Sequence, residues 1–423
     1  MLQTMNKIFT YILPVAAALL LSSCLKDMKE TELFEGSKEV EVSIMLPEAL
    51  EAEAKSDFKV ILRNSKTGVV LTTLTDAQGV ARLETEYGTY SVIVSKQIEV
   101  EGAIKILSFS QNIVLSRNDK AVEKLTAELT ASNKGTIILK EVYFHVAKTP
   151  SGANYTSDQY FILYNNSEKV QYLDGIGLGT HTTYNSNAKR IYVKSWLGDD
   201  NTDPRDSVPI CAFGFNFPGK GTEHPLQPGE EVVVALSAIN HTSAMTTVPL
   251  NLATENTWAM WMPALKLQKT PEVPQDRWLN PYCEQGMGTM YTISRTSPTF
   301  IIYRIEGSAE EYVKDGVTLG EPGGHMISAP PTYTSKVYSI MIPKEWVYDG
   351  VEFRISESEV PRLCPEISLQ SLLITSGQGS GISYIRKVDE EATAAAGHTV
   401  YQDTNDSSQD WVMIPRPTLY KGN

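Results

Sequence analysis

The sequence predicts an all-β protein with two successive β-sandwich domains. Three observations favour this fold class. Short runs of alternating or β-branched residues recur through residues 40–131 and again after residue 136. Glycine, proline, asparagine and serine separate these runs, as turns between short strands require. Apolar residues at helical spacing are scarce in the same regions, so few helices are expected.

Residues 1–23 have the composition of a secretory signal segment. Lys7 provides a short cationic region, an apolar stretch covers residues 8–21, and two serines end the segment. The apolar stretch is shorter than the roughly 20 residues that a membrane-spanning helix needs. We therefore expect this segment to be cleaved and not to remain as a transmembrane anchor.

The end of this segment predicts a lipid anchor. Leu21-Ser22-Ser23-Cys24 resembles the bacterial lipobox, a resemblance which implies that Cys24 is lipidated and becomes the first mature residue. The alternative is an incidental cysteine beside an ordinary signal site, and the full pattern favours the lipobox. Leu25-Lys26-Asp27 is similar to the lysine–acid export tag of Bacteroidetes surface lipoproteins, with Met28 in place of a second acid. The expected location is the outer membrane, facing the extracellular side.

Composition and charge exclude some classes of function. The chain of 423 residues has a formal net charge of −13, with 42% hydrophobic and 21% charged residues. A protein that neutralises phosphates needs clustered lysine and arginine, and no such run occurs, so nucleic acid is not an expected partner. The length exceeds what one hydrophobic core usually serves, which predicts at least two domains.

Residues 24–38 are predicted to be a flexible tether and residues 39–132 the first sandwich. The tether is polar and too poor in apolar residues to fold alone. The segment 120–132 suits both helical and strand spacing, and its length and setting favour a closing strand. Five earlier runs have strand character, at residues 40–45, 58–62, 69–74, 81–84 and 90–94.

Two short motifs indicate the type of the first sandwich. Residues 75–79 read Thr-Asp-Ala-Gln-Gly, and residues 87–92 read Tyr-Gly-Thr-Tyr-Ser-Val. The glycines allow the positive φ angles that tight hairpins need. Together the motifs resemble the TDxxG and xGxYxV pattern of transthyretin-like and Cna-B-like domains, which implies an Ig-like sandwich. Such modules act mostly as stalks or spacers, so the resemblance implies no chemistry.

Residues 133–423 are predicted to form the second, larger domain, which begins with a β run at Thr136. Residues 158–167 and 226–235, with the C-terminal segments 381–387 and 403–411, resemble a lamin-tail type of Ig-like domain. A plain lamin-tail domain is much shorter, which implies insertions. The whole arrangement is similar to a family of uncharacterised Bacteroidetes surface lipoproteins. That resemblance implies TonB-dependent outer-membrane receptors as partners and gives no catalytic residues.

No motif predicts catalysis, a cofactor or a metal site. The glycine-rich segment 376–381 lacks the G-x-S-x-G spacing of a nucleophile elbow and is read as a loop. Residues 199–206 alternate oxygen donors, but Pro204 and Ile210 stand where an EF-hand requires glycine and an acid, which favours a solvated loop. No two of the six histidines have the spacing of a helical zinc site. They are His145, His181, His224, His241, His325 and His398.

Two further groups of residues are an acidic cluster near the C-terminus and three cysteines. The acidic cluster 403–410 is expected to cap turns between the final strands. Cys211, Cys283 and Cys364 form no C-x-x-C pair. Two of them would form a disulfide in an oxidising compartment, whereas three buried thiols are an equal alternative.

Aromatic residues suggest one candidate ligand site, for a glycan. Trp258, Trp261 and Trp278 lie in a proline-rich region near Met260 and Tyr282, and indole faces stack well on sugar rings. Trp258 and Trp261 are three residues apart, a spacing that more often indicates core packing.

The leading functional hypothesis is a non-enzymatic surface lipoprotein that binds a nutrient for a TonB-dependent receptor. The second is an adhesive or structural surface protein, because stacked β-sandwiches on a tether project a tip from a cell. The third is a hydrolase without a recognisable motif. The expected partners are the membrane, through Cys24, a receptor, and an unidentified ligand such as a glycan.

Overall fold

The computed structural model describes two compact units. Unit 1 comprises Met1–Lys96 and Phe109–Thr130, and unit 2 comprises Gln97–Ser108 and Ala131–Asn423. Among the described residues, strands of several sheets far outnumber helical residues, which confirms the predicted all-β class. The described residues are 36–100, 103–117, 121–182, 207–284, 290–291, 293–314, 325–328, 338–357, 359, 361–375 and 377–422.

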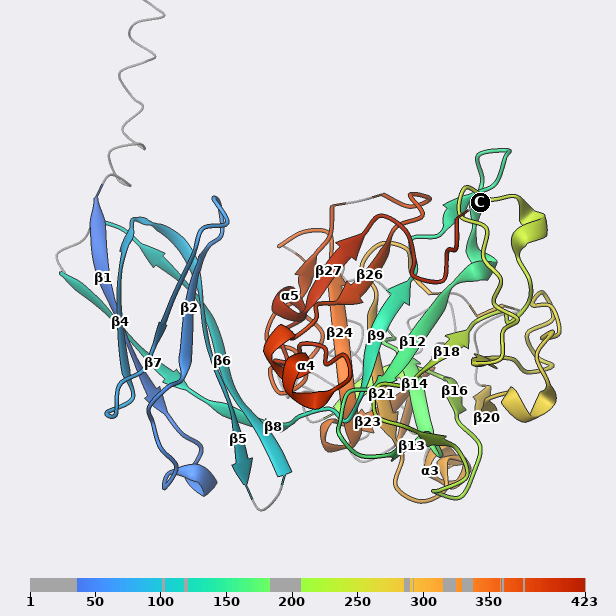
Figure 1. The fold of residues 1–423 in the computed structure, drawn as a ribbon, viewed down its shortest axis with the longest axis horizontal. Coiled ribbons are helices and arrows are strands. Elements are labelled where there is room, and N and C mark those ends of the chain that lie inside the picture. Colours follow the sequence, from blue (N-terminus) through green and yellow to red (C-terminus); the bar gives the residue numbers. More distant parts are fainter. Residues whose placement is uncertain are drawn as a thin grey trace, which may run out of the picture. The chain divides into compact units, whose positions relative to one another are not determined.

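Unit 1 is built on a three-stranded sheet and on most of a five-stranded sheet (Figure 1), while residues 97–100, 103–108 and 131–133 of the second sheet belong to unit 2. The order of the first is β4-β1-β7, with β1 antiparallel to β4 and parallel to β7. The order of the second is β3-β2-β5-β6-β8. The elements are β1 Ser37–Met45, η2 Glu48–Leu50, β2 Lys59–Asn64, β3 Val70–Leu74, β4 Val80–Glu86, β5 Gly88–Val100, β6 Ala103–Leu115, β7 Val122–Glu128 and β8 Thr130–Asn133.

Strand β1 shows how this sandwich is specified. Its even-numbered side chains are buried, as the two-residue period of a strand with one face on a core requires. Val40 and Val42 are fully buried. The strand begins at Ser37, so Ser37 and Lys38 of the predicted tether belong to it. Lys38 can be buried because its Nζ lies 3.3 Å from an oxygen of Glu123.

The five predicted runs of unit 1 lie in β1 to β5, and the ambiguous segment 120–132 folds as β7 and β8. The sequence reasoning missed β6, a strand of 13 residues. Residues 106–108 of β6 are buried in succession, on both faces of the strand. That breaks the alternation by which a half-buried strand is recognised.

Unit 2 is built on two six-stranded sheets with smaller sheets around them. One has the order β19-β18-β12-β9-β26-β27 and the other β20-β16-β14-β21-β24-β25. The smaller sheets are β15-β23-β22, β10-β11 and β13-β17. The strands are β9 Ile137–Tyr143, β10 Ala147–Lys148, β11 Asn154–Tyr155, β12 Tyr160–Asn165, β13 Gln171–Tyr172, β14 Ile176–Thr180, β15 Ser207–Cys211, β16 Phe213–Asn216, β17 Pro225–Leu226, β18 Glu231–Ala235, β19 Thr257–Ala259, β20 Asn280–Glu284, β21 Thr299–Arg304, β22 Met326–Ser328, β23 Tyr338–Pro343, β24 Val347–Arg354, β25 Leu372–Leu373, β26 Ser383–Arg386 and β27 Trp411–Ile414.

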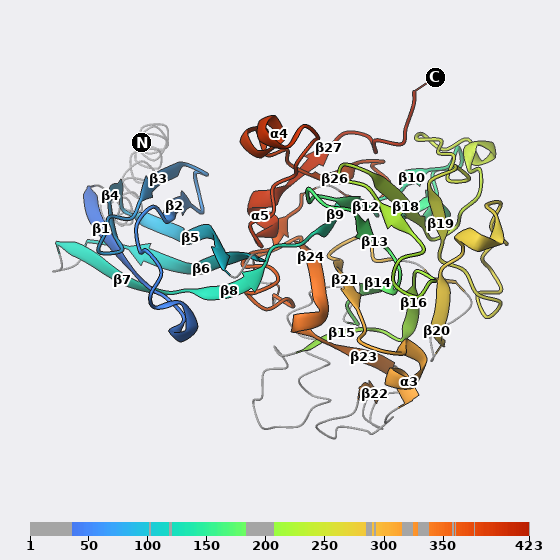
Figure 2. The same ribbon diagram turned by 60° about the horizontal axis from the view of Figure 1, so that its bottom comes forward.

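The described helices of unit 2 are short, and α3 lies near β20, β22 and β23 in Figure 2. No helix among the described residues is both long and apolar enough to span a membrane. The helices are η3 Thr156–Asp158, η4 Thr242–Ala244, η5 Gln275–Arg277, α3 Ala309–Lys314, η6 Lys344–Trp346, α4 Glu390–Ala396 and α5 Ser407–Asp410.

An aromatic core joins the two six-stranded sheets. Phe353 of β24 lies with its ring centroid 4.9 Å from Phe144, which follows β9, and 4.9 Å from Tyr384 of β26. Phe161 of β12 meets Phe300 of β21 edge to face at 4.9 Å. Ring pairs of this kind contribute about 0.5–1.5 kcal/mol each beyond their buried area. The sheets are therefore held together by aromatic contacts from four or more strands.

The central strand β12 is buried on both faces. All of its residues, 160–165, are buried. Phe161 and Leu163 face the aromatic core. Tyr160 and Ile162 belong to a separate apolar cluster that includes Val248, Leu250 and Leu252. A strand covered on both sides reads as a continuous apolar run and not as an alternating one.

Strand β14 contains glycines because its neighbours come very close. A Cβ added at Gly177 would lie 2.6 Å from the ring of Tyr303. We expect Gly177→Ala to lower the free energy of unfolding by about 1–3 kcal/mol, since extra volume in a packed core forces shifts. Gly377→Ala is the control, because no atom lies within 4 Å of its added Cβ. Urea denaturation followed by tryptophan fluorescence would measure both, and equal midpoints would contradict the close packing of β14.

Candidate functional site

The structure separates the three tryptophans of the predicted glycan site. Trp258 is 7% exposed and lies in the aromatic core, 4.9 Å from the ring of Phe217. Trp261 and Trp278 are half-buried and meet edge to face with ring centroids 5.0 Å apart. Both of their indole N–H groups donate to backbone carbonyls, at 3.4 and 3.1 Å. The structure thus brings Trp261 and Trp278 together and places Trp258 in the core.

Several sequence predictions lie outside the described residues. These include the lipidation site Cys24, the signal segment and the acidic segment 199–206. In the glycine-rich segment 376–381, residues 377–381 are described, and residues 378–380 lie in a turn.

The three described cysteines are buried and form no disulfide. Burial raises the pKa of the Cys364 thiol to about 12. Since the thiolate is the reactive form, Cys364 is suited neither to nucleophilic attack nor to binding a metal. In the described part of the chain, no group of three or more His, Cys, Asp or Glu side chains is arranged to hold a metal ion.

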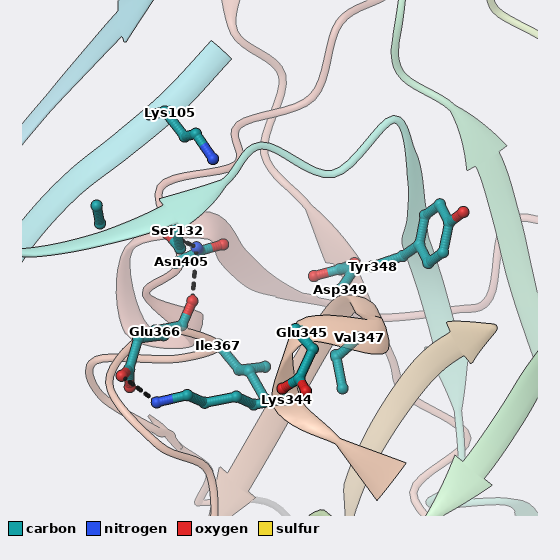
Figure 3. Close-up of a pocket in the computed structure, with 11 residues that line it drawn as sticks. Lys105, Ser132, Lys344, Glu345, Val347, Tyr348, Asp349, Glu366, Ile367 and Asn405 are labelled. Carbon is teal, nitrogen blue, oxygen red and sulfur yellow. Dashed lines mark hydrogen bonds and ion pairs between the residues drawn. The ribbon is translucent and has the colours of Figure 1, made fainter. Parts of the chain in front are cut away.

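The candidate site is a cleft of about 230 Å³ in unit 2, lined by polar and apolar surface in about equal parts (Figure 3). The helix η6 and the start of β24 form one side of it, and the loops around residues 366 and 405 form another. Its lining residues come from five places in the sequence, all within unit 2. They are Lys105, Ala131, Ser132, Lys344, Glu345, Val347, Tyr348, Asp349, Glu366, Ile367 and Asn405.

Asn405 is fixed at the wall of the cleft by its own hydrogen bonds. Its Nδ2 donates to Ser132 Oγ at 2.6 Å and to the carbonyl of Glu366 at 2.9 Å. The residue is 8% exposed, and its backbone is left-handed with φ 53°. No described residue donates to its Oδ1, which points into the cleft in Figure 3. The side chain therefore presents a held acceptor to the cavity.

Charged groups of both signs line the rest of the cleft. Lys344 Nζ lies 2.8 Å from an oxygen of Glu366. Burial acts to raise the pKa of Glu366, but the hydrogen bond and charge of Lys344, together with hydrogen bonds from its own backbone and from Cys364, lower the pKa overall. Lys105 points its ammonium group toward the same space, and Glu345 is exposed. The cleft thus offers donor-only and acceptor-only groups side by side.

Beneath the cleft, Asp349 belongs to a buried ionic cluster around Arg386. Arg386 Nη2 lies 2.5 Å from Asp349 Oδ1, and its Nη1 lies 3.1 Å from Asp410 Oδ2 and 3.7 Å from Asp403 Oδ1. The second oxygen of Asp349 accepts from the backbone N–H of Leu139 at 2.7 Å. Each of these four side chains is at most 2% exposed.

This cluster has one cation for three carboxyl groups. Burial raises the pKa of Asp403 to about 7, against the opposing effect of Arg386. Burial likewise raises the pKa of Asp349. Oδ2 of Asp403 accepts from the N–H of Gly135 at 3.0 Å, whereas Oδ1 takes no hydrogen bond from a described residue. Asp403 therefore holds a proton more readily than an exposed aspartate does.

Sequence reasoning missed this site almost entirely. It expected the segment 403–410 to cap turns, and Asp406 does cap α5 by accepting from Ser408 and Gln409. It did not foresee that Asp403 and Asp410 bind Arg386, or that Asn405 faces a cavity. The local signal was Arg386 itself, a charged residue directly after Tyr384 and Ile385 in the segment 381–387.

The fold and the site define a class: a two-unit β-protein with a cleft in its larger unit. The family model described as a protein of unknown function, DUF4876, matches residues 227–418. The match includes Lys344, Asp349, Glu366 and Asn405, whereas Lys105 and Ser132 lie outside it.

A solved structure supports this fold. The crystal structure of a DUF4876 family protein from Bacteroides thetaiotaomicron has a TM-score of 0.56 and 21% identity to this chain. The alignment covers 89% of this chain and 94% of that one. A DUF3823 family protein from Parabacteroides merdae aligns over 48% of this chain and 81% of its own, with 9% identity and a TM-score of 0.16, too low to inform the fold. None of the curated proteins compared with the chain matches it significantly.

Proposed function

We propose that this chain is a non-enzymatic lipoprotein of the outer-membrane surface that binds a small nutrient and works with a TonB-dependent receptor. The observation that carries the proposal is the N-terminal segment, in which a signal sequence ends at Leu21-Ser22-Ser23-Cys24. The lysine and acid after Cys24 favour the outer face. The cleft between η6, β24 and the loops of unit 2 supplies a place for a ligand.

The chemistry of the cleft supports binding over catalysis. Lys344 is bound to Glu366 and Asp349 is bound to Arg386, so neither is a poised base or acid. The described cysteines are buried. Asn405 supplies a neutral acceptor, which suits recognition.

The anchor can be tested by replacing Cys24 with alanine in a Bacteroides host. The wild-type protein is expected in the outer-membrane fraction and to be cleaved when intact cells are treated with protease. Cys24→Ala is expected to lose the acyl chains and to leave the membrane fraction almost completely, because those chains supply the hydrophobic attachment. Ser23→Ala is the matched control, since it keeps a small residue before the cysteine.

Crosslinking on the same cells tests the partner. A TonB-dependent receptor is expected among the proteins crosslinked to the wild-type chain.

Retention of Cys24→Ala in the membrane fraction would contradict the lipid anchor. A deletion strain that grows normally on every nutrient but attaches poorly to surfaces would instead support an adhesive role.

A further inference from the structure

We propose that the cleft binds a neutral, polyhydroxylated ligand, either a monosaccharide or the terminal sugar of a glycan. This inference deepens the proposed nutrient-binding function and rests on it for the source of the ligand. Three features of the cleft favour such a ligand: its size, the fixed amide of Asn405, and the balance of charges around it.

The size of the cleft limits the ligand to about one ring. Drug-sized ligands occupy pockets of roughly 300–1,000 Å³, and this cleft measures about 230 Å³. Val347, Ile367 and Ala131 give part of the wall an apolar character. A sugar ring presents C–H groups to such surfaces and hydroxyls to polar ones. A longer glycan would leave its remaining units outside the cleft.

The amide of Asn405 gives the site its directional hydrogen bond. Both protons of an amide nitrogen are available to donate, and here the nitrogen donates to Ser132 Oγ and to the backbone of Glu366. Those bonds fix the amide plane, so the oxygen is held in one direction before any ligand arrives. An acceptor held in this way costs little further ordering when a hydroxyl donates to it. The left-handed backbone of Asn405 is a constraint that the surrounding loop maintains.

The charges around the cleft disfavour an ionic ligand. An anion would face Glu345 and Glu366, and a cation would face Lys105 and Lys344. A hydroxyl group is both a donor and an acceptor, so it can accept from an ammonium group and donate to a carboxylate or amide oxygen. A ring with several hydroxyls can therefore satisfy both kinds of group without a net charge of its own.

The test uses the full-length lipoprotein in a detergent that has no sugar headgroup. Saturation-transfer NMR would compare four neutral sugars, D-glucose, D-galactose, D-mannose and N-acetyl-D-glucosamine, with glycine, acetate and methylammonium. We expect at least one neutral sugar to bind and the three charged probes not to bind. Isothermal titration calorimetry would then give the affinity for the best sugar.

Two variants locate the binding. Asn405→Gly removes the amide, and glycine accepts the positive φ without strain; we expect affinity to fall about tenfold or more. Lys105→Gln keeps a polar side chain but changes the donor, and we expect a severalfold loss. Glu255→Gln replaces an exposed glutamate elsewhere in unit 2 and is expected to bind like wild type. Thermal unfolding of each variant would show that it remains folded.

The outcomes separate this proposal from the proposed function. Binding of glycine without any sugar would overturn the ligand class. Sugar binding that survives both Asn405→Gly and Lys105→Gln would move the site elsewhere and overturn the assignment to this cleft, as would the absence of any binding. The tests of surface exposure and of receptor crosslinking do not depend on sugar binding. The proposed function can therefore be supported even where the sugar proposal is overturned.

Discussion

Replacing Arg386 by methionine is expected to destabilise unit 2 by about 3–5 kcal/mol, because it leaves buried carboxyl groups without their cation. Asp349, Asp403 and Asp410 all lie within 4 Å of the guanidinium group. Arg386 also donates to the carbonyl of Leu139 and packs with its guanidinium carbon 5.2 Å from the ring centroid of Trp411. Methionine keeps some of that packing, so the expected loss is chiefly electrostatic.

Urea denaturation of the full chain would measure this loss. Tryptophan fluorescence reports on unit 2 alone, since all six tryptophans lie after residue 131. Arg277→Met replaces a partly exposed arginine and is expected to change stability by less than about 0.5 kcal/mol. Combining Arg386→Met with asparagine at the three aspartates should recover part of the loss, because the uncompensated charges are then gone. A single variant as stable as wild type would show that the cluster does not need its cation.

Replacing Asp403 by asparagine is expected to stabilise the protein at pH 8 and to remove one component of its pH dependence. The pKa of Asp403 is about 7 in the folded protein and about 3.9 in an unfolded chain. The folded state therefore binds the proton more tightly. Stability from this group is present below pH 4, falls as the pH rises from about 4 to 7, and is constant above that range.

The groups that face Asp403 decide this behaviour. They are Arg386, Asp349, Asp410 and Lys134, together with the backbone N–H of Gly135. Burial lowers the pKa of His145 to about 4. This histidine therefore makes the free energy of unfolding rise between about pH 4 and 6.5, whereas Asp403 makes it fall. The wild-type curve alone would mix the two effects.

The difference between wild type and Asp403→Asn isolates the aspartate. We expect the free energy of unfolding of the variant, relative to that of wild type, to rise by about 1 kcal/mol per pH unit from pH 4 to 7. Above pH 7 this difference should stay constant. Glu255→Gln changes an exposed acid to an amide and provides the control. Its free energy of unfolding should differ from that of wild type by the same amount at every pH. A pH-independent difference for Asp403→Asn would mean that Asp403 is ionised throughout this range.

Most of the strands of unit 1 could be predicted from the sequence, because a strand with one buried face leaves a two-residue pattern. Strand β1 and the other predicted runs of unit 1 followed that rule. The strands that depart from it do so for a structural reason. Residues 106–108 of β6 are buried in succession, and every residue of β12 is buried because apolar clusters cover both of its faces.

The cleft could not be predicted, because its residues are distant in the chain. Lys105, Glu366 and Asn405 meet only after the loops of unit 2 have folded. None of them belongs to a motif with a fixed spacing. Trp258, a member of the candidate glycan site, lies in the core, which agrees with the alternative that its spacing to Trp261 favours.

The sequence by itself determined the all-β class and supplied the expectation of an anchor at Cys24, because alternation, turn residues and a signal segment are local patterns. Only the tertiary structure decided that Arg386 neutralises carboxyl groups from β24 and the C-terminal loop, and that Asn405 faces a cavity. Those interactions depend on distances between segments that are remote in sequence, which local patterns do not encode.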